Sequence, residues 1–189
     1  MFLKGFLITS FTLIASHAIA APVITIQTEY FTVTGNDSNS LYQSLQKNGP
    51  IGENGDRYHA VTRWKARWSY SWRETSRWCQ LSGVEVSLDI DYLLPKFKAL
   101  ESKPEHLKKS WDNYFQALFK HEQQHKDYGV QAANELEQAL LAINERQACT
   151  TLQNNMADTA QQILDKYDLL EKEFDRVTNH GLNQGIKLQ

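Results

Sequence analysis

Apolar and polar residues alternate in three segments of the chain, 23–33, 62–73 and 84–92, and this period of two predicts three β-strands. In the middle segment one face carries basic and small polar residues, and the other includes Trp64, Trp68 and Trp72. Because large aromatic side chains bury much area, we expect the tryptophan face to pack against the core, with a sugar-stacking platform as the alternative. The third strand is expected to end at Pro95.

Further along the chain, apolar residues recur every three or four positions, which predicts two long helices. The first should begin at the capping box Ser102-Lys103-Pro104-Glu105 and run to about Arg146, broken only at Gly129. The second should follow Cys149, and its helical period is lost from Phe174 onward.

A short helix, capped by Asp37 or Ser38, is expected between the first two strands. Three strands, a short helix and two long helices predict an α+β fold, in which a small antiparallel or mixed sheet packs on the two long helices.

The first long helix carries the sequence His121-Glu122-Gln123-Gln124-His125. One helical turn separates the two histidines, so both imidazoles can bind one metal ion, and Glu122 lies beside them where it can accept a proton from water. Both histidines also belong to the apolar stripe of this helix, which contains Leu107, Trp111, Tyr114, Leu118, Tyr128, Ala132, Leu136, Ala139 and Ile143. An inward imidazole needs a partner for each ring nitrogen, and Zn²⁺ together with a hydrogen-bond acceptor would supply both. Hydrogen-bonded core histidines are the alternative.

A catalytic zinc site also requires a third protein ligand. Glu145 follows His125 by twenty residues, a spacing that resembles thermolysin-like proteases, but a continuous helix would place it about 30 Å away. His106 lies too far along the same helix, which leaves His59 and His180 among the histidines. His180 stands in irregular chain before a glycine, where a ligand can be aimed, with an ordinary surface histidine as the alternative.

The first twenty residues have the features of a signal peptide: Lys4, an apolar run, and Ala18-Ile19-Ala20 as the cleavage signature. We therefore expect residues 21–189 to form a single zinc-protease-like domain in the periplasm or outside the cell. The apolar run is shorter than the roughly 20 residues of a membrane span, so stable membrane insertion is not expected.

Cysteine content and charge narrow the picture further. Cys79 and Cys149 are the only cysteines, and in an oxidising compartment they are expected to form a disulfide, with two buried free thiols as the alternative. Without Lys4 the mature chain has 19 basic and 22 acidic residues, a net charge of −3, which argues against nucleic acid as a partner.

Three segments carry a resemblance to a known family: Thr62-Arg63-Trp64, the helix Trp111-x-x-Tyr114…Leu118-x-x-His121-Glu122-x-x-His125, and the tail Phe174-Asp175-x-x-Thr178-x-His180-Gly181. Together they resemble a bacterial family catalogued as domain of unknown function 922 and described as predicted secreted zinc-dependent proteases. The resemblance extends over roughly residues 28–188, and the family tail usually has tyrosine in place of Phe174. It implies His121 and His125 as zinc ligands, Glu122 as the general base, and His180 as the third ligand with Asp175 as its hydrogen-bond acceptor.

These observations predict a metallopeptidase that hydrolyses peptide bonds with water activated by Zn²⁺ and Glu122. Its substrate would be a peptide or protein held along an edge strand of the sheet. Tyr70, Tyr92 and Tyr128 are candidates for stabilising the oxyanion. The alternatives are a non-catalytic zinc-binding or carbohydrate-interaction module of the cell envelope, and a cell-wall amidase.

Overall fold

A mixed three-stranded sheet forms one layer of the protein. The computed structural model describes residues 21–52, 55–98 and 100–188, so the predicted signal peptide lies outside the described residues. The sheet contains β1 (Val23–Val33), β2 (Val61–Glu74) and β3 (Cys79–Phe97) in the order β1-β3-β2. β3 pairs in parallel with β1 and antiparallel with β2.

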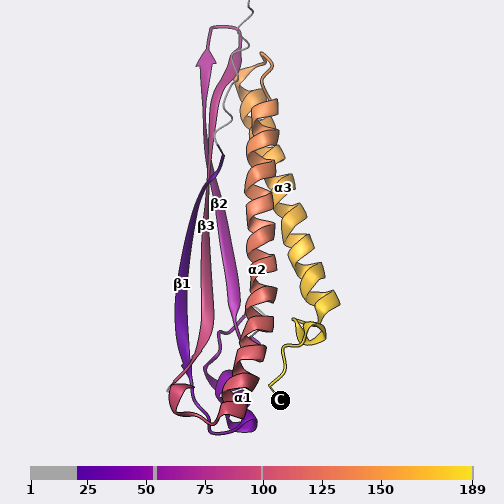
Figure 1. Ribbon diagram of the computed structural model, residues 1–189. Coiled ribbons are helices and arrows are strands. Elements are labelled where there is room, and N and C mark those ends of the chain that lie inside the picture. The colour runs from indigo at the N-terminus through magenta and orange to yellow at the C-terminus, as the bar shows by residue number, and fades with distance from the viewer. Residues whose placement is uncertain (1–20, 53–54, 99, 189) are drawn as a thin grey trace, which may run out of the picture.

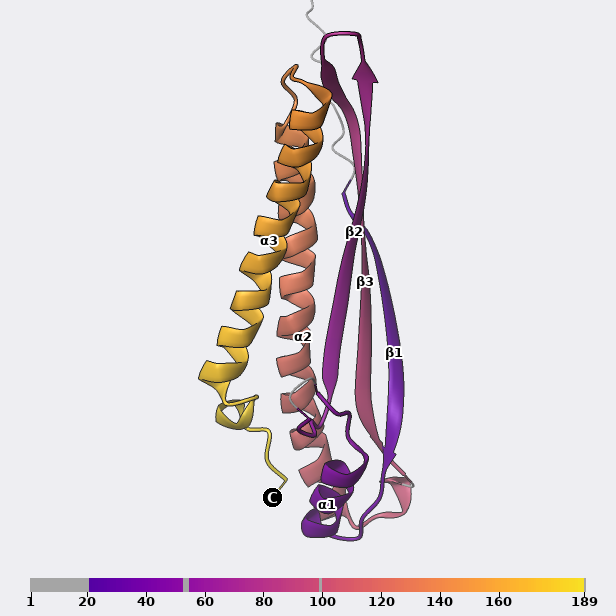
Figure 2. The same ribbon diagram turned by 180° about the vertical axis from the view of Figure 1, so that it is seen from behind.

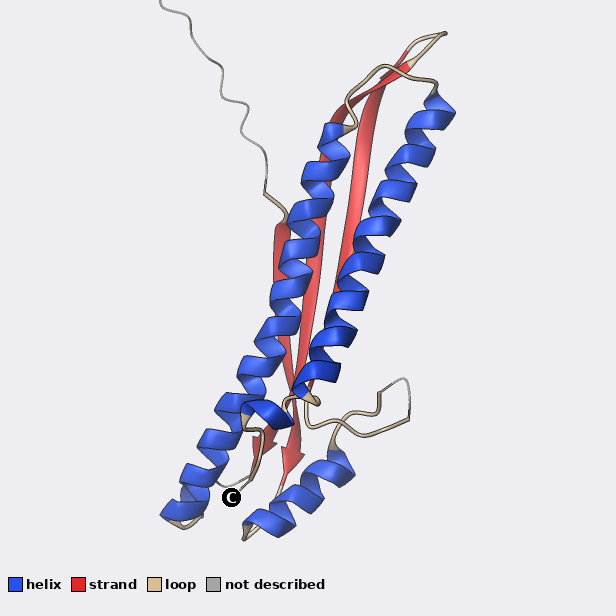
Figure 3. Cartoon of the chain, turned by 90° about the vertical axis from the view of Figure 1, so that its right-hand side faces the viewer, coloured by secondary structure: helices blue, strands red, loops and turns tan. Residues whose placement is uncertain are grey.

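Two long helices form the second layer. α2 (Glu105–Ala142) and α3 (Cys149–Thr178) run in opposite directions on one face of the sheet, as Figures 1 and 2 show from opposite sides and Figure 3 shows from the helix side. The short helix α1 (Ser38–Asn48) lies at the end of the sheet where α2 begins, and Asp37 caps it. The expected α+β fold, a mixed sheet packed on two long helices, is thus confirmed. Because α3 runs back along α2, its C-terminal end lies beside the middle of α2.

The buried layer between sheet and helices follows the predicted patterns. Alternate residues of β3 from Val84 to Leu94 are buried, as is most of the α2 stripe. The tryptophan face of β2 is half-buried and packs against this core, as expected. On the opposite face of the sheet, Arg67 of β2 forms an ion pair with Asp89 of β3.

Several element boundaries differ from the predictions, and α2 ends at Ala142, before the expected Arg146. β3 continues through Pro95 to Phe97, because beyond Leu93 it pairs only with β1, and a strand that is open on one side tolerates proline. α2 begins at Glu105 after Pro104, without the predicted capping box. Ser102 instead belongs to a preceding 3-10 turn (Leu100–Ser102), which Lys103 closes with a backbone hydrogen bond to Leu100.

Gly129 does not interrupt α2; it allows the helix to approach the sheet closely. A Cβ atom at this position would lie 2.6 Å from Cγ of Trp64, a distance that real Cβ atoms essentially never show. The glycine therefore makes room for the indole ring of β2 against the helix. This close contact places β2 beside the segment of α2 that carries the two histidines.

A disulfide between Cys79 and Cys149 joins the start of β3 to the start of α3, as expected. Cys79 also exchanges two backbone hydrogen bonds with Gln147, which precedes α3. These links fix the turn between the long helices to the sheet. Among the described residues, no helix combines the length and the apolar character that crossing a membrane requires.

Candidate metal centre

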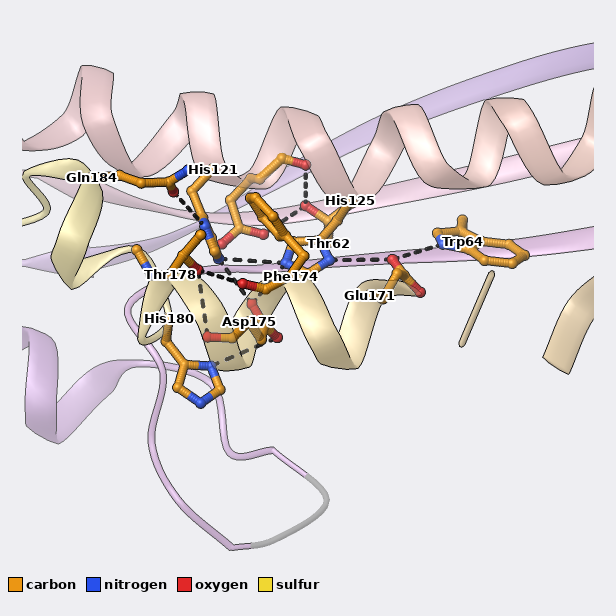
Figure 4. A network of polar contacts seen from close by, with 12 residues as sticks. Thr62, Trp64, His121, His125, Glu171, Phe174, Asp175, Thr178, His180 and Gln184 are labelled. Atoms are coloured by element: carbon orange, nitrogen blue, oxygen red, sulfur yellow. Dashed lines mark hydrogen bonds and ion pairs between the residues drawn. The ribbon is translucent and has the colours of Figure 1, made fainter. Parts of the chain in front are cut away.

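Three potential metal ligands from two helices converge on one point (Figure 4). His121 and His125 of α2 direct their Nε2 atoms toward each other, 3.4 Å apart. Oδ1 of Asp175, near the end of α3, lies 3.1 Å from each of these nitrogens. The histidine side chains are only 5 % and 11 % exposed. Two buried nitrogens and one carboxylate oxygen thus surround one point.

The remaining ring nitrogens of both histidines have polar partners. Nδ1 of His121 lies 2.9 Å from Oε1 of Gln184, and Nδ1 of His125 lies 3.2 Å from Oε1 of Glu171. The Trp64 indole donates a hydrogen bond of 2.9 Å to the same Glu171 oxygen. Contacts of this kind fix the orientation of a ligating imidazole and determine which nitrogen faces the metal.

The carboxylates strongly change the protonation of this cluster. Burial by itself lowers the pKa of His125, but hydrogen bonds to Asp175 and Glu171 outweigh it and raise the pKa to about 10. Burial raises the pKa of Asp175, yet the hydrogen bonds from His121 and His125 hold it well below its usual range. Both shifts favour a protonated His125 paired with an ionised Asp175 as long as no metal is bound.

Glu122 lies on the same turn of α2 and is almost completely buried. Its Oε2 accepts a hydrogen bond of 2.7 Å from the Thr62 hydroxyl of β2, which fixes the carboxylate from the sheet side. Burial raises the pKa of Glu122, and the Thr62 hydrogen bond and the two histidines offset this only in part. A carboxylate with a raised pKa and a fixed orientation is suited to accepting and returning a proton near neutral pH.

The way in which α3 ends explains why Asp175 and His180 lie together. The sequence pattern predicted irregular chain from Phe174, but the helix continues to Thr178 and ends with Asn179 in the left-handed conformation, φ 51°. The backbone N–H of His180 bonds to the Asp175 carbonyl, and that of Asn179 bonds to Arg176. These are the two hydrogen bonds of a Schellman motif, which returns the chain to the last turn of the helix.

Gly181 continues this left-handed turn and brings the C-terminal segment against the histidines. Its φ is +79°, and a Cβ atom there would lie 2.1 Å from Cδ1 of Ile186. Only glycine fits such a position without displacing its neighbours. The segment that follows carries Gln184 to Nδ1 of His121.

His180 lies next to this cluster but outside it. Its Nδ1 is 3.6 Å from Oδ2 of Asp175, the oxygen that faces away from the other two histidines, and its side chain is 52 % exposed. Its ring packs against Tyr58, with 5.4 Å between the ring centres. His59 is hydrogen-bonded to Gln46 of α1. Glu145 lies in the turn after α2, at the end of that helix far from His125.

A cavity of about 1080 Å³ opens over the cluster. Its walls come from the chain leading into β2, the middle of α2, the end of α3 and the C-terminal segment. His121, Glu122, His125, Asp175 and His180 all line it. The structure therefore gathers the predicted general base, the three predicted zinc ligands and Asp175 in one cavity.

Three residues that position the cluster had no predicted role: Thr62, Glu171 and Gln184. Glu171 and Asp175 are four residues apart, so they share one face of α3. This spacing would have indicated a pair of inward carboxylates if the helix had been extended past Phe174. The sequence contains no comparable signal for Gln184, which reaches His121 only through the turn at Gly181.

Comparison with models of known protein families gives a match over residues 28–181, to a family described as "Bacterial protein of unknown function (DUF922)". The match covers most of the described chain, including Thr62, both histidines of α2, Asp175 and His180. Searches of curated proteins and of solved structures gave no match.

Proposed function

The chain belongs to this bacterial family (DUF922), and from that premise and the geometry above we propose that it is a zinc-dependent peptidase of the periplasm or the cell exterior. The family description assigns no function, so the proposal rests on the site. The observation that supports it most is the mutual approach of His121, His125 and Asp175 within 3.1–3.4 Å. The disulfide also fits an oxidising compartment.

The spacing of the three atoms matches tetrahedral zinc. With zinc–ligand distances of about 2.0–2.1 Å, a tetrahedral site places its ligand atoms about 3.3 Å apart. Two imidazoles and a carboxylate are also ligands that zinc commonly binds, and three protein ligands leave one position open for catalysis. Asp175 therefore takes the role of third ligand in this proposal, in place of His180.

When bound, zinc supplies an electrophile that polarises the scissile carbonyl group and acidifies water. Glu122 accepts the proton of the attacking water and returns it to the leaving amine. Thr62 keeps the Glu122 carboxylate directed at the cavity, and Glu171 and Gln184 keep the two imidazoles oriented.

β2 offers a place for an extended substrate. It is an edge strand of the described sheet, and its first residues, Val61–Arg63, line the cavity beside Glu122. An extended peptide can add to such an edge through backbone hydrogen bonds. This placement brings a peptide bond of the added strand next to the general base.

The experiment that tests the proposal compares the zinc-loaded chain with its Glu122→Gln variant on a peptide library, with peptidoglycan fragments offered in parallel. We expect the wild type to cleave peptides, and the variant to keep its zinc while turnover falls by roughly 10²–10⁴-fold. Glu145→Gln is the matched control, because this exposed carboxylate lies far from the cluster, and it should behave as wild type.

If the protein cleaves the peptidoglycan fragments and none of the peptides, its activity is that of an amidase and not of a peptidase. A wild type that binds zinc and turns over neither substrate, like Glu122→Gln, would contradict hydrolysis altogether and favour a non-catalytic zinc-binding module.

A further inference from the structure

The left-handed turn after α3 holds a histidine at the wall of the cavity. Asn179 and His180 have φ values of 51° and 49°, and Gly181 follows at 79°. Residues other than glycine adopt this conformation at a cost in free energy, and such positions are concentrated at functional sites. The turn places His180 beside Asp175, on the side of the carboxylate that faces away from His121 and His125.

The exposure of His180 differs from that of the two histidines in the cluster. Its side chain is 52 % exposed, against 5 % and 11 % for His121 and His125. At 3.6 Å from Asp175 Oδ2, its Nδ1 is beyond the length of a hydrogen bond. The half-exposed ring therefore has hydrogen-bonding capacity left for a molecule in the cavity beside the cluster.

The tyrosines expected to stabilise an oxyanion are not in a position to do so. Among the described residues that line the cavity, Tyr70, Tyr92 and Tyr128 are absent. Tyr70 packs against Trp72 of the same strand, Tyr92 packs against Phe119 of α2, and Tyr128 packs against Phe174. The hydrogen bond that stabilises the developing oxyanion must therefore come from another residue.

We propose that His180 is a catalytic residue that binds the negatively charged oxygen of the reacting group through a ring N–H. This inference rests on the proposed zinc-dependent hydrolysis, and it assigns a function to a residue whose sequence pattern suggested a metal ligand. Tyr58, which also lines the cavity, packs against the His180 ring. A preorganised donor of this kind stabilises charge that develops in the transition state.

The test uses His180→Asn in the full mature chain, because asparagine also tolerates the left-handed backbone. His106→Asn, at the exposed start of α2, is the matched control. For each protein we would measure zinc affinity, the absorption spectrum of the Co²⁺-substituted form, and the affinity for acetohydroxamate, a small anion that binds an open zinc position without needing a peptide subsite.

The expected result for His180→Asn is unchanged zinc affinity and an unchanged Co²⁺ spectrum, with acetohydroxamate binding weakened by roughly 10- to 100-fold, the loss of one hydrogen bond to a charged group. The control should match wild type in all three measurements. Loss of zinc or an altered Co²⁺ spectrum would show that His180 is a metal ligand. An acetohydroxamate affinity equal to that of wild type would exclude a hydrogen bond between His180 and the bound anion. Either result overturns the inference even if peptides are cleaved. If no peptide is cleaved while the acetohydroxamate difference is found, only the peptidase activity fails.

Discussion

Zinc binding should compete with a proton on His125, because Asp175 and Glu171 stabilise the charged ring in the zinc-free protein. Its pKa is raised to about 10, against an ordinary value of about 6.5. At pH 7.5 the neutral ring, the form that binds a metal, is then present in only about one molecule in several hundred, which costs zinc binding about 3 kcal/mol. Raising the pH from 6.5 to 8.5 should tighten zinc binding by at least about 100-fold.

The same proton affects the stability of the zinc-free protein. A histidine whose pKa is higher in the folded state than in the unfolded state stabilises the fold. This contribution is at its full size below the unfolded-state pKa of about 6.5, and it is lost as the pH rises through the folded-state pKa of about 10. The melting temperature of the zinc-free protein should therefore carry a contribution that declines between these two pH values. Zinc-bound protein should lack it, because the metal has already displaced the proton.

An NMR titration of zinc-free, histidine-labelled protein measures this pKa directly, with the His125 resonance assigned from a His125→Gln variant. We expect the ring to stay protonated well above pH 8. In Glu171→Gln the midpoint should fall, because one of the carboxylates that stabilise the charged ring is gone. A wild-type midpoint near 6.5, or one that Glu171→Gln leaves unchanged, would refute the reasoning.

Three further predictions concern the supports of the site. Thr62→Val should keep zinc and lower peptide turnover by roughly 10- to 100-fold, because Glu122 loses its hydrogen bond. Thr62→Ser, which keeps the hydroxyl group, should retain most of the activity in the same turnover assay. Reducing the disulfide, which closes a loop of 70 residues, should lower the free energy of unfolding by about 2–4 kcal/mol in denaturant titrations; an unchanged midpoint would contradict its stabilising role. Gly129→Ala should destabilise by about 1–3 kcal/mol, because the added Cβ collides with Trp64, and wild-type stability would show that the contact is loose.

Features that depend on neighbouring residues could be predicted from the sequence. The alternation in β2 and β3 determines which side chains face the helices, and the i, i+4 spacing of His121 and His125 places both on the inward stripe of α2. Asp37, one of the two residues predicted to cap α1, does so through a hydrogen bond to a residue three positions along the chain.

Features that depend on packing between distant segments were harder to predict. Between Asp175 and Asn179 only Val177 is apolar, so the apolar period gave no reason to extend the helix. Packing of α3 against α2 keeps this turn helical and places Asp175 against two residues that lie fifty and fifty-four positions earlier. The sequence thus indicated the residues of the candidate site, while the relative positions of Asp175 and His180 required the fold.

The most direct test of the proposed zinc centre is the zinc affinity of the purified mature chain beside Asp175→Asn, with Asp168→Asn on the same helix as the matched control. We predict about one zinc ion per chain for wild type and control. Asp175→Asn should weaken binding by more than the roughly 10- to 100-fold that results from losing a hydrogen-bond partner of a ligand. Wild-type protein that stays metal-free in excess zinc, or an Asp175→Asn variant that binds zinc as wild type does, would contradict the proposed centre.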